Sequence, residues 1–115
     1  MEFIYHICEW DELVTCPIMS QDGKASCALF SEKENPKVVY LANLYVDPSR
    51  RKEGCGKELL RFCEGLAHDM GYESISLKVE IITWMRKWYE REGFEFAEMD
   101  EEDPISYVWL RKAIA

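Results

Sequence analysis

The spacing of hydrophobic residues predicts mainly strands in the first part of the chain. Residues 3–7 (FIYHI) have the aromatic and β-branched content of a short strand. Residues 8–13 (CEWDEL) are compatible with one helical turn or with an irregular crossing. Residues 37–46 (KVVYLANLYV) form a long run that is apolar enough to predict a strand buried on both faces.

A β-hairpin is predicted between these runs. Residues 13–19 (LVTCPIM) and 24–33 (KASCALFSEK) both read as strands, and the Asp22-Gly23 pair between them is a strong hairpin signal. Pro17 has no backbone N–H to donate to a neighbouring strand. We therefore expect the first arm of the hairpin to be an edge strand or to be bulged.

A helix and a further strand follow. From Gly56 to Met70, apolar residues recur at spacings of three and four and form one stripe, which consists of Leu59, Leu60, Cys63, Leu66, Ala67 and Met70. Gly71 is well placed to end this helix. Residues 74–80 (SISLKVE) then alternate apolar and polar side chains, as a strand does. A strand, a helix and a strand of these lengths predict a right-handed crossover between two parallel strands.

The last third of the chain predicts one more helix and two strands. Residues 83–92 (TWMRKWYERE) have Thr83 as a candidate N-cap and are followed by Gly93. One face of this helix carries Met85, Trp88 and Tyr89. Residues 94–99 (FEFAEM) and 105–112 (ISYVWLRK) are joined by a short acidic turn, which favours an antiparallel hairpin.

Composition and charge narrow the class of protein. The 115 residues suffice for one domain, 1–115, and they carry 14 basic and 22 acidic residues, a net charge of −8. This charge argues against broad electrostatic binding to nucleic acid or to anionic membranes. No apolar stretch has the length of a bilayer span and the N-terminus lacks signal-peptide character, so we expect a cytoplasmic protein. Five cysteines without a C-x-x-C pair predict reduced thiols and no metal site.

One segment between the long strand and the first helix departs from this acidic composition. Within eight residues it holds Arg50, Arg51, Lys52, Gly54, Gly56 and Lys57. A helix N-terminus has backbone N–H groups without intrahelical partners, and glycine lets a ligand approach them closely. We therefore expect a polyphosphate here; the alternative is a tight turn with solvated cations. Glu58 after the lysine excludes a Walker loop, and Leu59 in place of a third glycine excludes a dinucleotide fingerprint.

The remaining pattern is [R/Q]-x-x-G-x-[G/A], met by residues 51–56 (RKEGCG). Together with residues 44–51 (LYVDPSRR) and with Y-x-x-x-G-F at 89–94, it resembles the GNAT superfamily of acetyl-coenzyme A-dependent N-acyltransferases. The resemblance covers about Lys37 to Leu110. It implies an α+β fold with a mixed, mostly antiparallel sheet of about six to seven strands and helices on both faces.

The resemblance also implies the co-substrate, acetyl-CoA, and no metal. In the family the glycine loop holds the coenzyme A pyrophosphate on backbone amides, and the preceding strand pairs with the pantetheine arm. These positions are here Leu44, Tyr45, Val46, Arg51, Lys52, Glu53, Gly54, Cys55, Gly56, Lys57 and Tyr89. A strand that binds pantetheine in this way is expected to separate from the strand that follows Gly71.

Three groups are candidates for the chemistry. From the family motif, Tyr89 inherits the role of general acid for the departing thiolate, and the alternative is a core aromatic residue. The N–H of Val46 is the expected oxyanion donor. Glu80 ends the strand after the first helix and is the candidate general base, directly or through a water, unless it is only a solvated surface glutamate. Ile82 occupies the place where the family often has asparagine.

These features predict transfer of an acetyl group to a primary amine by direct attack in a ternary complex. The alternative is a coenzyme A-binding module without transferase activity, which Ile82 and the absence of a carboxylate in residues 40–46 favour and Tyr89 disfavours. The acceptor is a small molecule or a protein, and the acidic charge favours a cationic amine. Only residues 8–13 stand where the family has two helices, so the acceptor site is either open or completed by a second chain of a homodimer.

Overall fold

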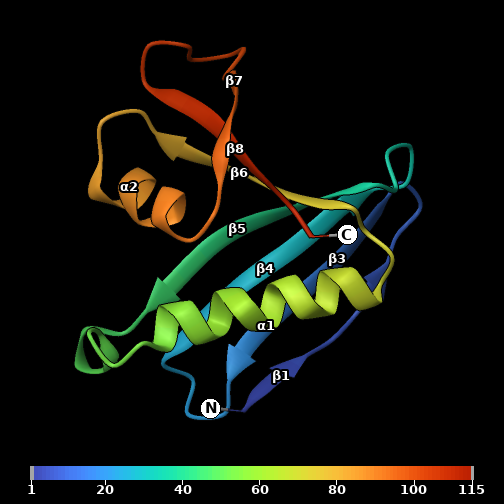
Figure 1. The fold of residues 1–115 in the computed structure, drawn as a ribbon. Helices are drawn as coiled ribbons and strands as arrows, with labels where there is room; N and C mark the ends of the chain where they lie inside the picture. The colour runs from blue at the N-terminus through green and yellow to red at the C-terminus, as the bar shows by residue number, and fades with distance from the viewer. Residues whose placement is uncertain (1, 115) are drawn as a thin grey trace.

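The computed structural model describes residues 2–114, which form one eight-stranded sheet and two α-helices (Figure 1). The strands are β1 (Phe3–Tyr5), β2 (Cys8–Glu9), β3 (Leu13–Ser20), β4 (Ala25–Glu32), β5 (Val38–Val46), β6 (Ser74–Glu80), β7 (Glu95–Met99) and β8 (Tyr107–Ala113). The helices are α1 (Cys55–Asp69), α2 (Trp84–Arg91) and the short 3-10 helix η1 (Pro48–Arg50).

The sheet is mixed, and its one parallel pair is the one that the sequence predicts. The strand order is β1-β3-β4-β5-β6-β8-β7, with β2 also beside β3. Neighbours are antiparallel except β5 and β6, which α1 connects. The predicted hairpins β3–β4 and β7–β8 are both present, and Gly23 adopts φ 75° in the first of them. The predicted fold class is confirmed.

The two helices begin and end where local chemistry predicts. Gly54 precedes α1 in the left-handed region, and Gly71 follows its C-cap at φ 93°. Thr83 caps α2 by accepting a hydrogen bond from the Met85 N–H, and Gly93 follows its end at φ 102°. Each helix then buries its apolar stripe against the sheet.

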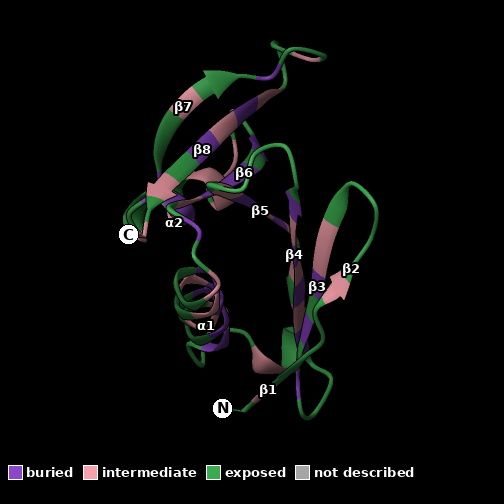
Figure 2. Ribbon diagram, turned by 90° about the vertical axis from the view of Figure 1, so that its right-hand side faces the viewer, coloured by how far each residue is buried: buried purple, intermediate pink, exposed green. Residues whose placement is uncertain are grey.

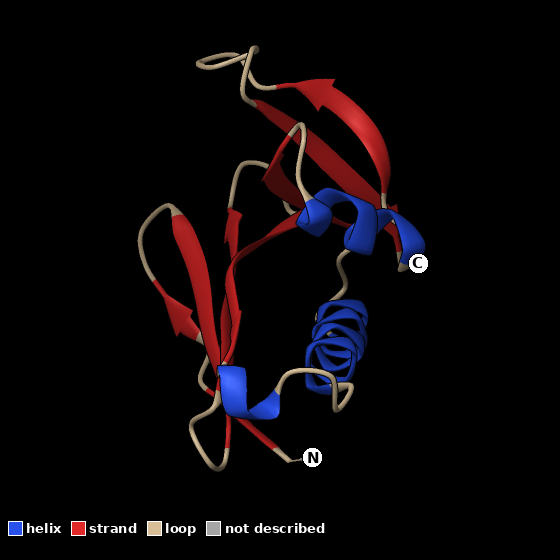
Figure 3. Ribbon diagram, turned by 90° about the vertical axis from the view of Figure 1, so that its left-hand side faces the viewer, coloured by secondary structure: helices blue, strands red, loops and turns tan. Residues whose placement is uncertain are grey.

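Both helices lie on the same, concave side of the twisted sheet (Figures 2 and 3). The core is one cluster to which α1 contributes Leu59, Leu60, Cys63 and Ala67 and α2 contributes Tyr89. The prediction of helices on both faces is therefore wrong in this detail. The prediction that residues 37–46 are buried on both faces is also wrong, because only alternate residues of β5 face the helices.

The first strands also correct the sequence reading. Residues 8–13 contain no helical turn and include β2, which pairs with β3. Because β1 and β2 both pair with the outer side of β3, β3 is not at the edge of the sheet. The break between these two short strands falls near Pro17, whose carbonyl accepts from the His6 N–H. The strand pairing on the outer side of β3 is therefore interrupted at the proline, between β1 and β2.

All five cysteines are free thiols, as predicted. Cys16, Cys27, Cys55 and Cys63 are buried, and the sulfur atoms of Cys27 and Cys63 lie 3.3 Å apart in the core between β4 and α1. Among the described residues, neither helix is long and apolar enough to cross a bilayer.

Candidate active site

The strands β5 and β6 separate after a short paired stretch and leave a wedge-shaped gap (Figure 1). Their pairing ends at Tyr40 and Ser76, whereas the strands themselves continue to Val46 and Glu80. The gap holds a cavity of about 550 Å³ whose walls come from β5, β6, α2 and β8. The separation that the resemblance implies is thus present in this chain.

A bulge in β5 directs the end of this strand toward the gap. Pairing with β4 shifts register between Ala42 and Tyr45, and Asn43 in the bulge has φ 57°. Beyond the bulge, the Asp47 N–H donates to the backbone of residue 24 at 2.7 Å. Bonded and non-bonded pairs alternate between antiparallel strands, so the N–H and C=O of Val46 point away from β4. This N–H therefore faces the gap.

Tyr89 reaches the same cavity from α2. Tyr89 is 5% exposed, and its ring packs edge-on against Trp88 and Phe94, with centroids 5.0 and 5.6 Å away. Within residues 2–114 its hydroxyl makes no hydrogen bond. Burial raises the pKa of Tyr89 above its ordinary value, so the hydroxyl keeps its proton at neutral and mildly alkaline pH.

Glu80 lies at the carboxyl end of β6 and also lines the cavity. Its side chain is exposed, and its strand neighbour on β8 is Tyr107. On the same face, the Lys78 ammonium group lies 5.1 Å from the centre of the Tyr107 ring. The gap therefore has a carboxylate on one wall and a neutral phenol on another, which is the composition that proton transfer to and from a bound ligand requires.

The glycine loop lies at the open end of the gap. A Cβ atom on Gly56 would lie 3.7 Å from the Val46 side chain and 3.5 Å from the Trp88 ring, so the start of α1 adjoins both β5 and α2. Glu58 donates the first helical hydrogen bond, to Gly54, which leaves the N–H groups of residues 55–57 without intrahelical acceptors. Lys52 and Gly54 have positive φ values of 69° and 79° and form the turn that exposes these amides.

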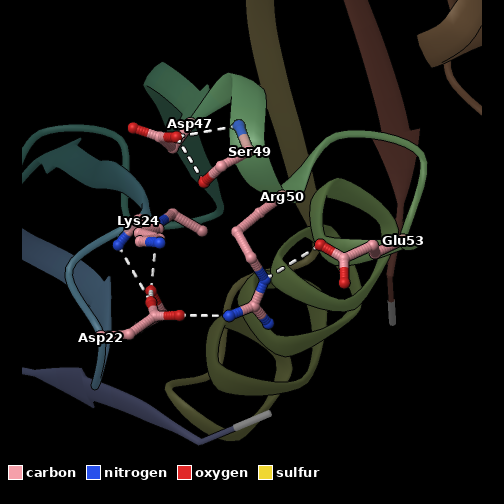
Figure 4. Close-up of polar contacts among 8 residues, drawn as sticks. Asp22, Lys24, Asp47, Ser49, Arg50 and Glu53 are labelled. Carbon is pink, nitrogen blue, oxygen red and sulfur yellow. Dashed lines mark hydrogen bonds and ion pairs between the residues drawn. The ribbon is translucent and has the colours of Figure 1, made fainter.

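Both arginines of this segment hold the glycine loop in place. Arg50 is held by an ion pair with Asp22 and lies 3.2 Å from Glu53, while Asp47 caps η1 by accepting from Ser49 (Figure 4). Arg50 thus ties the β3–β4 turn to the glycine loop and is not a free cation. The Arg51 side chain donates to the Val46 carbonyl at 3.1 Å and fastens the loop to the end of β5.

Asp22→Asn should destabilise the protein at about pH 7 and much less at about pH 3. Hydrogen bonds from Ser20 and from the Lys24 N–H, together with Arg50, lower the pKa of Asp22 in the folded state. The stability that the ionised Asp22 carboxylate contributes is therefore fully present above the unfolded pKa of about 3.9. It is lost as the pH falls through the lowered pKa of the folded state. Chemical denaturation at the two pH values measures it.

The matched control for this prediction is Glu53→Gln. Glu53 is the more exposed partner of Arg50, with 55% of its side chain accessible against 36% for Asp22, so its loss should change stability less. A destabilisation by Asp22→Asn that stays the same at both pH values would contradict the assigned role of the carboxylate.

Comparison with known proteins shows the family to which this chain belongs. Residues 4–96 match the sequence profile of the acetyltransferase (GNAT) domain. The chain belongs to the GNAT acetyltransferase family. It is accordingly a GNAT-type acyltransferase, and the recognition from the glycine loop and Y-x-x-x-G-F is confirmed.

Solved structures share the fold of this GNAT domain at low sequence identity. An acetyltransferase from Bacillus cereus is 23% identical with a TM-score of 0.67, over 89% of this chain and 73% of that one. An aminoglycoside 6'-N-acetyltransferase is 16% identical with a TM-score of 0.72, over 91% and 74%. The ribosomal-protein-S18-alanine N-acetyltransferase from Escherichia coli is 16% identical with a TM-score of 0.69, over 93% and 72%. No curated protein sequence matches.

The structure of the GNAT domain brings together some predicted site residues and separates others. Leu44, Glu80 and Tyr89 line one cavity, and the Val46 backbone faces the same gap. Lys57 instead lines a different hollow, with Phe3 and Phe62. Tyr45 is half exposed and does not line the cavity.

Sequence reasoning missed the aromatic side of this cavity. Phe30, Tyr40, Tyr107 and Trp109 line it from three different strands. The signal was present in β8, where Tyr107 and Trp109 alternate with the buried Val108 and Leu110. Alternation alone does not show which strand lies next to which, so it could not place these rings at the gap.

Proposed function

We propose that this GNAT domain transfers an acetyl group from acetyl-CoA to a primary amine by direct attack in a ternary complex. The observation that carries the proposal is the gap between β5 and β6, where Tyr89 and Glu80 line one cavity and the Val46 N–H points away from β4 toward the gap. The amide-rich start of α1 adjoins this gap and suits the pyrophosphate. Placing thioester and amine side by side would supply much of the acceleration through orientation.

Each of these groups has one role in the proposed reaction. Glu80 takes a proton from the attacking amine, directly or through a water, as the new C–N bond forms. The Val46 N–H stabilises the oxyanion of the tetrahedral intermediate. As the C–S bond breaks, Tyr89 donates its proton to the thiolate of coenzyme A. The raised pKa of Tyr89 is consistent with a group that must hold this proton at neutral pH.

The structural neighbours support acetyl-CoA as the co-substrate and leave the acceptor open. The aminoglycoside 6'-N-acetyltransferase was solved in complex with coenzyme A, as was an N-acetyltransferase from Thermoplasma acidophilum. By their names, one neighbour acts on a small aminoglycoside and another on a ribosomal protein. The same fold therefore serves acceptors of very different size.

Acetyl-CoA should raise the melting temperature of the protein by several degrees, whereas ATP and NAD should not. A ligand that binds only the folded state at about a hundred times its dissociation constant adds about 2.7 kcal/mol of stability. A thermal-shift series with the three ligands measures this. Stabilisation by ATP or NAD but not by acetyl-CoA would reject the proposed ligand class.

The transfer step is tested separately by release of free thiol with a panel of amines. A coenzyme A-binding module would show the thermal shift without any release. The exposure of Ile82, 94% accessible where the family often has asparagine, is the feature that most favours this alternative.

A further inference from the structure

Three aromatic side chains line the cavity on the sheet face opposite the helices, and we call them the aromatic wall. Phe30 and Tyr40 are stacked with ring centroids 5.2 Å apart, and Trp109 meets Tyr40 edge-on at 5.6 Å. The Trp109 indole N–H donates to the Asp100 carboxylate at 3.1 Å. Asp100 is itself buried and also accepts from the backbone N–H of Asp103. These contacts hold the wall in one orientation.

The wall joins the active-site cavity to a second cavity. Four side chains line both the cavity of about 550 Å³ and a neighbouring one of about 340 Å³, namely Phe30, Tyr40, Lys78 and Trp109. We call the continuous groove that they form the aromatic trough. It runs from Glu80 and its strand neighbour Tyr107 to the start of the loop between β7 and β8. In Figure 2 no helix covers this face of the sheet.

Negative charge is in excess at the far end of the aromatic trough. The second cavity is lined by five carboxylates and two cations. Glu98 lies 4.0 Å from the Arg111 guanidinium and is partly balanced. In the part of the chain that the structure describes, Glu32, Glu101 and Glu102 have no ion-pair partner. Aromatic faces followed by uncompensated carboxylates along one groove favour an elongated cation.

We propose that the aromatic trough is the acceptor site and that it takes an aliphatic diamine or polyamine; this inference rests on the proposed function. One amino group lies between Glu80 and Tyr89, the methylene chain lies on the aromatic wall, and a second ammonium group lies against Glu101 and Glu102. Glu80 on β6 and the loop that follows β7 lie on either side of β8, two strand spacings of about 4.8 Å apart, so the two amino groups are separated by roughly 7 Å or more. A 1,2-diamine is too short for this span, and 1,5-diaminopentane is long enough.

The test compares 1,5-diaminopentane with pentylamine and 1,2-diaminoethane as acceptors for the full chain, by thiol release from acetyl-CoA. We expect kcat/KM to be about tenfold higher for 1,5-diaminopentane than for pentylamine. In the double variant Glu101→Gln/Glu102→Gln the ratio should fall to about twofold, the statistical advantage of two equal amino groups once the charge attraction is gone. The control Glu12→Gln/Glu34→Gln removes two exposed carboxylates that do not line the trough, and it should keep the wild-type ratio.

The possible failures are distinguishable. Equal rates for 1,5-diaminopentane and pentylamine, or a preference that survives in Glu101→Gln/Glu102→Gln, would overturn the acceptor assignment while leaving acetyl transfer intact. A basic peptide that exceeds every diamine in kcat/KM would overturn the small-molecule class. No thiol release with any amine or peptide, despite acetyl-CoA binding, would instead reject the proposed function.

Discussion

Tyr89→Phe should lower kcat for acetyl transfer by about a hundredfold while leaving the affinity for acetyl-CoA within about twofold. The substitution removes one hydroxyl that faces the cavity and makes no hydrogen bond within residues 2–114, so the fold loses little. The thiolate of coenzyme A then leaves without a positioned acid. Steady-state kinetics gives kcat, and calorimetry gives the dissociation constant.

Tyr72→Phe is the matched control for this substitution. Tyr72 is also buried, but its hydroxyl is hydrogen-bonded to Ser31 at 2.5 Å and it does not line the cavity. Its loss should cost about 1 kcal/mol of stability and leave kcat unchanged. If Tyr89→Phe retains full turnover, the role of general acid is wrong.

The raised pKa of Tyr89 adds a prediction about alkaline pH for the same variant. Above about pH 10 the unfolded chain ionises this phenol while the folded chain retains its proton. Stability is therefore lost as pH rises from the unfolded pKa toward the raised folded pKa. Melting curves between about pH 8 and pH 11 should show a smaller loss for Tyr89→Phe than for the wild type.

Gly56→Leu should weaken acetyl-CoA binding by about tenfold or more, even though leucine is the better helix former. The new side chain enters the space between Val46 and Trp88, at the start of α1 where the pyrophosphate is expected. It would hold a phosphate away from the free amides of the first turn. Calorimetric titration with acetyl-CoA measures the effect.

Gly65→Leu on the same helix provides the control. Gly65 is exposed, and a Cβ atom there would meet nothing within 4 Å, so this variant gains helix propensity without approaching the gap. It should bind acetyl-CoA as the wild type does. Equal affinities of Gly56→Leu and Gly65→Leu would show that the start of α1 is not the pyrophosphate site.

Much of the fold follows from local patterns in the sequence. The helix stripe from Leu59 to Met70, the Thr83 cap and the Asp22-Gly23 turn each specify an element through contacts between near neighbours in the chain. The crossover rule then predicts the parallel pair β5–β6. The short strand β2 was missed because a strand of two residues carries no periodic signal of its own.

The candidate site was likewise predicted only in part. Tyr89 and the glycine loop were predicted because each belongs to a compact motif. The aromatic trough was not, because Phe30 and Trp109 belong to strands that never pair with each other. They come together through Tyr40, since the register of β4, β5, β6 and β8 places all these rings on one face of the sheet.

The sequence by itself determined the order and type of most elements, the glycine turn before α1 and the membership of the GNAT family, because these depend on residue chemistry within a few turns or strand residues. Only the tertiary structure decided that both helices share one face and that the other carries a groove with unbalanced carboxylates. Strand order, register and the point at which β5 and β6 separate depend on long-range packing, which no local spacing of residues contains.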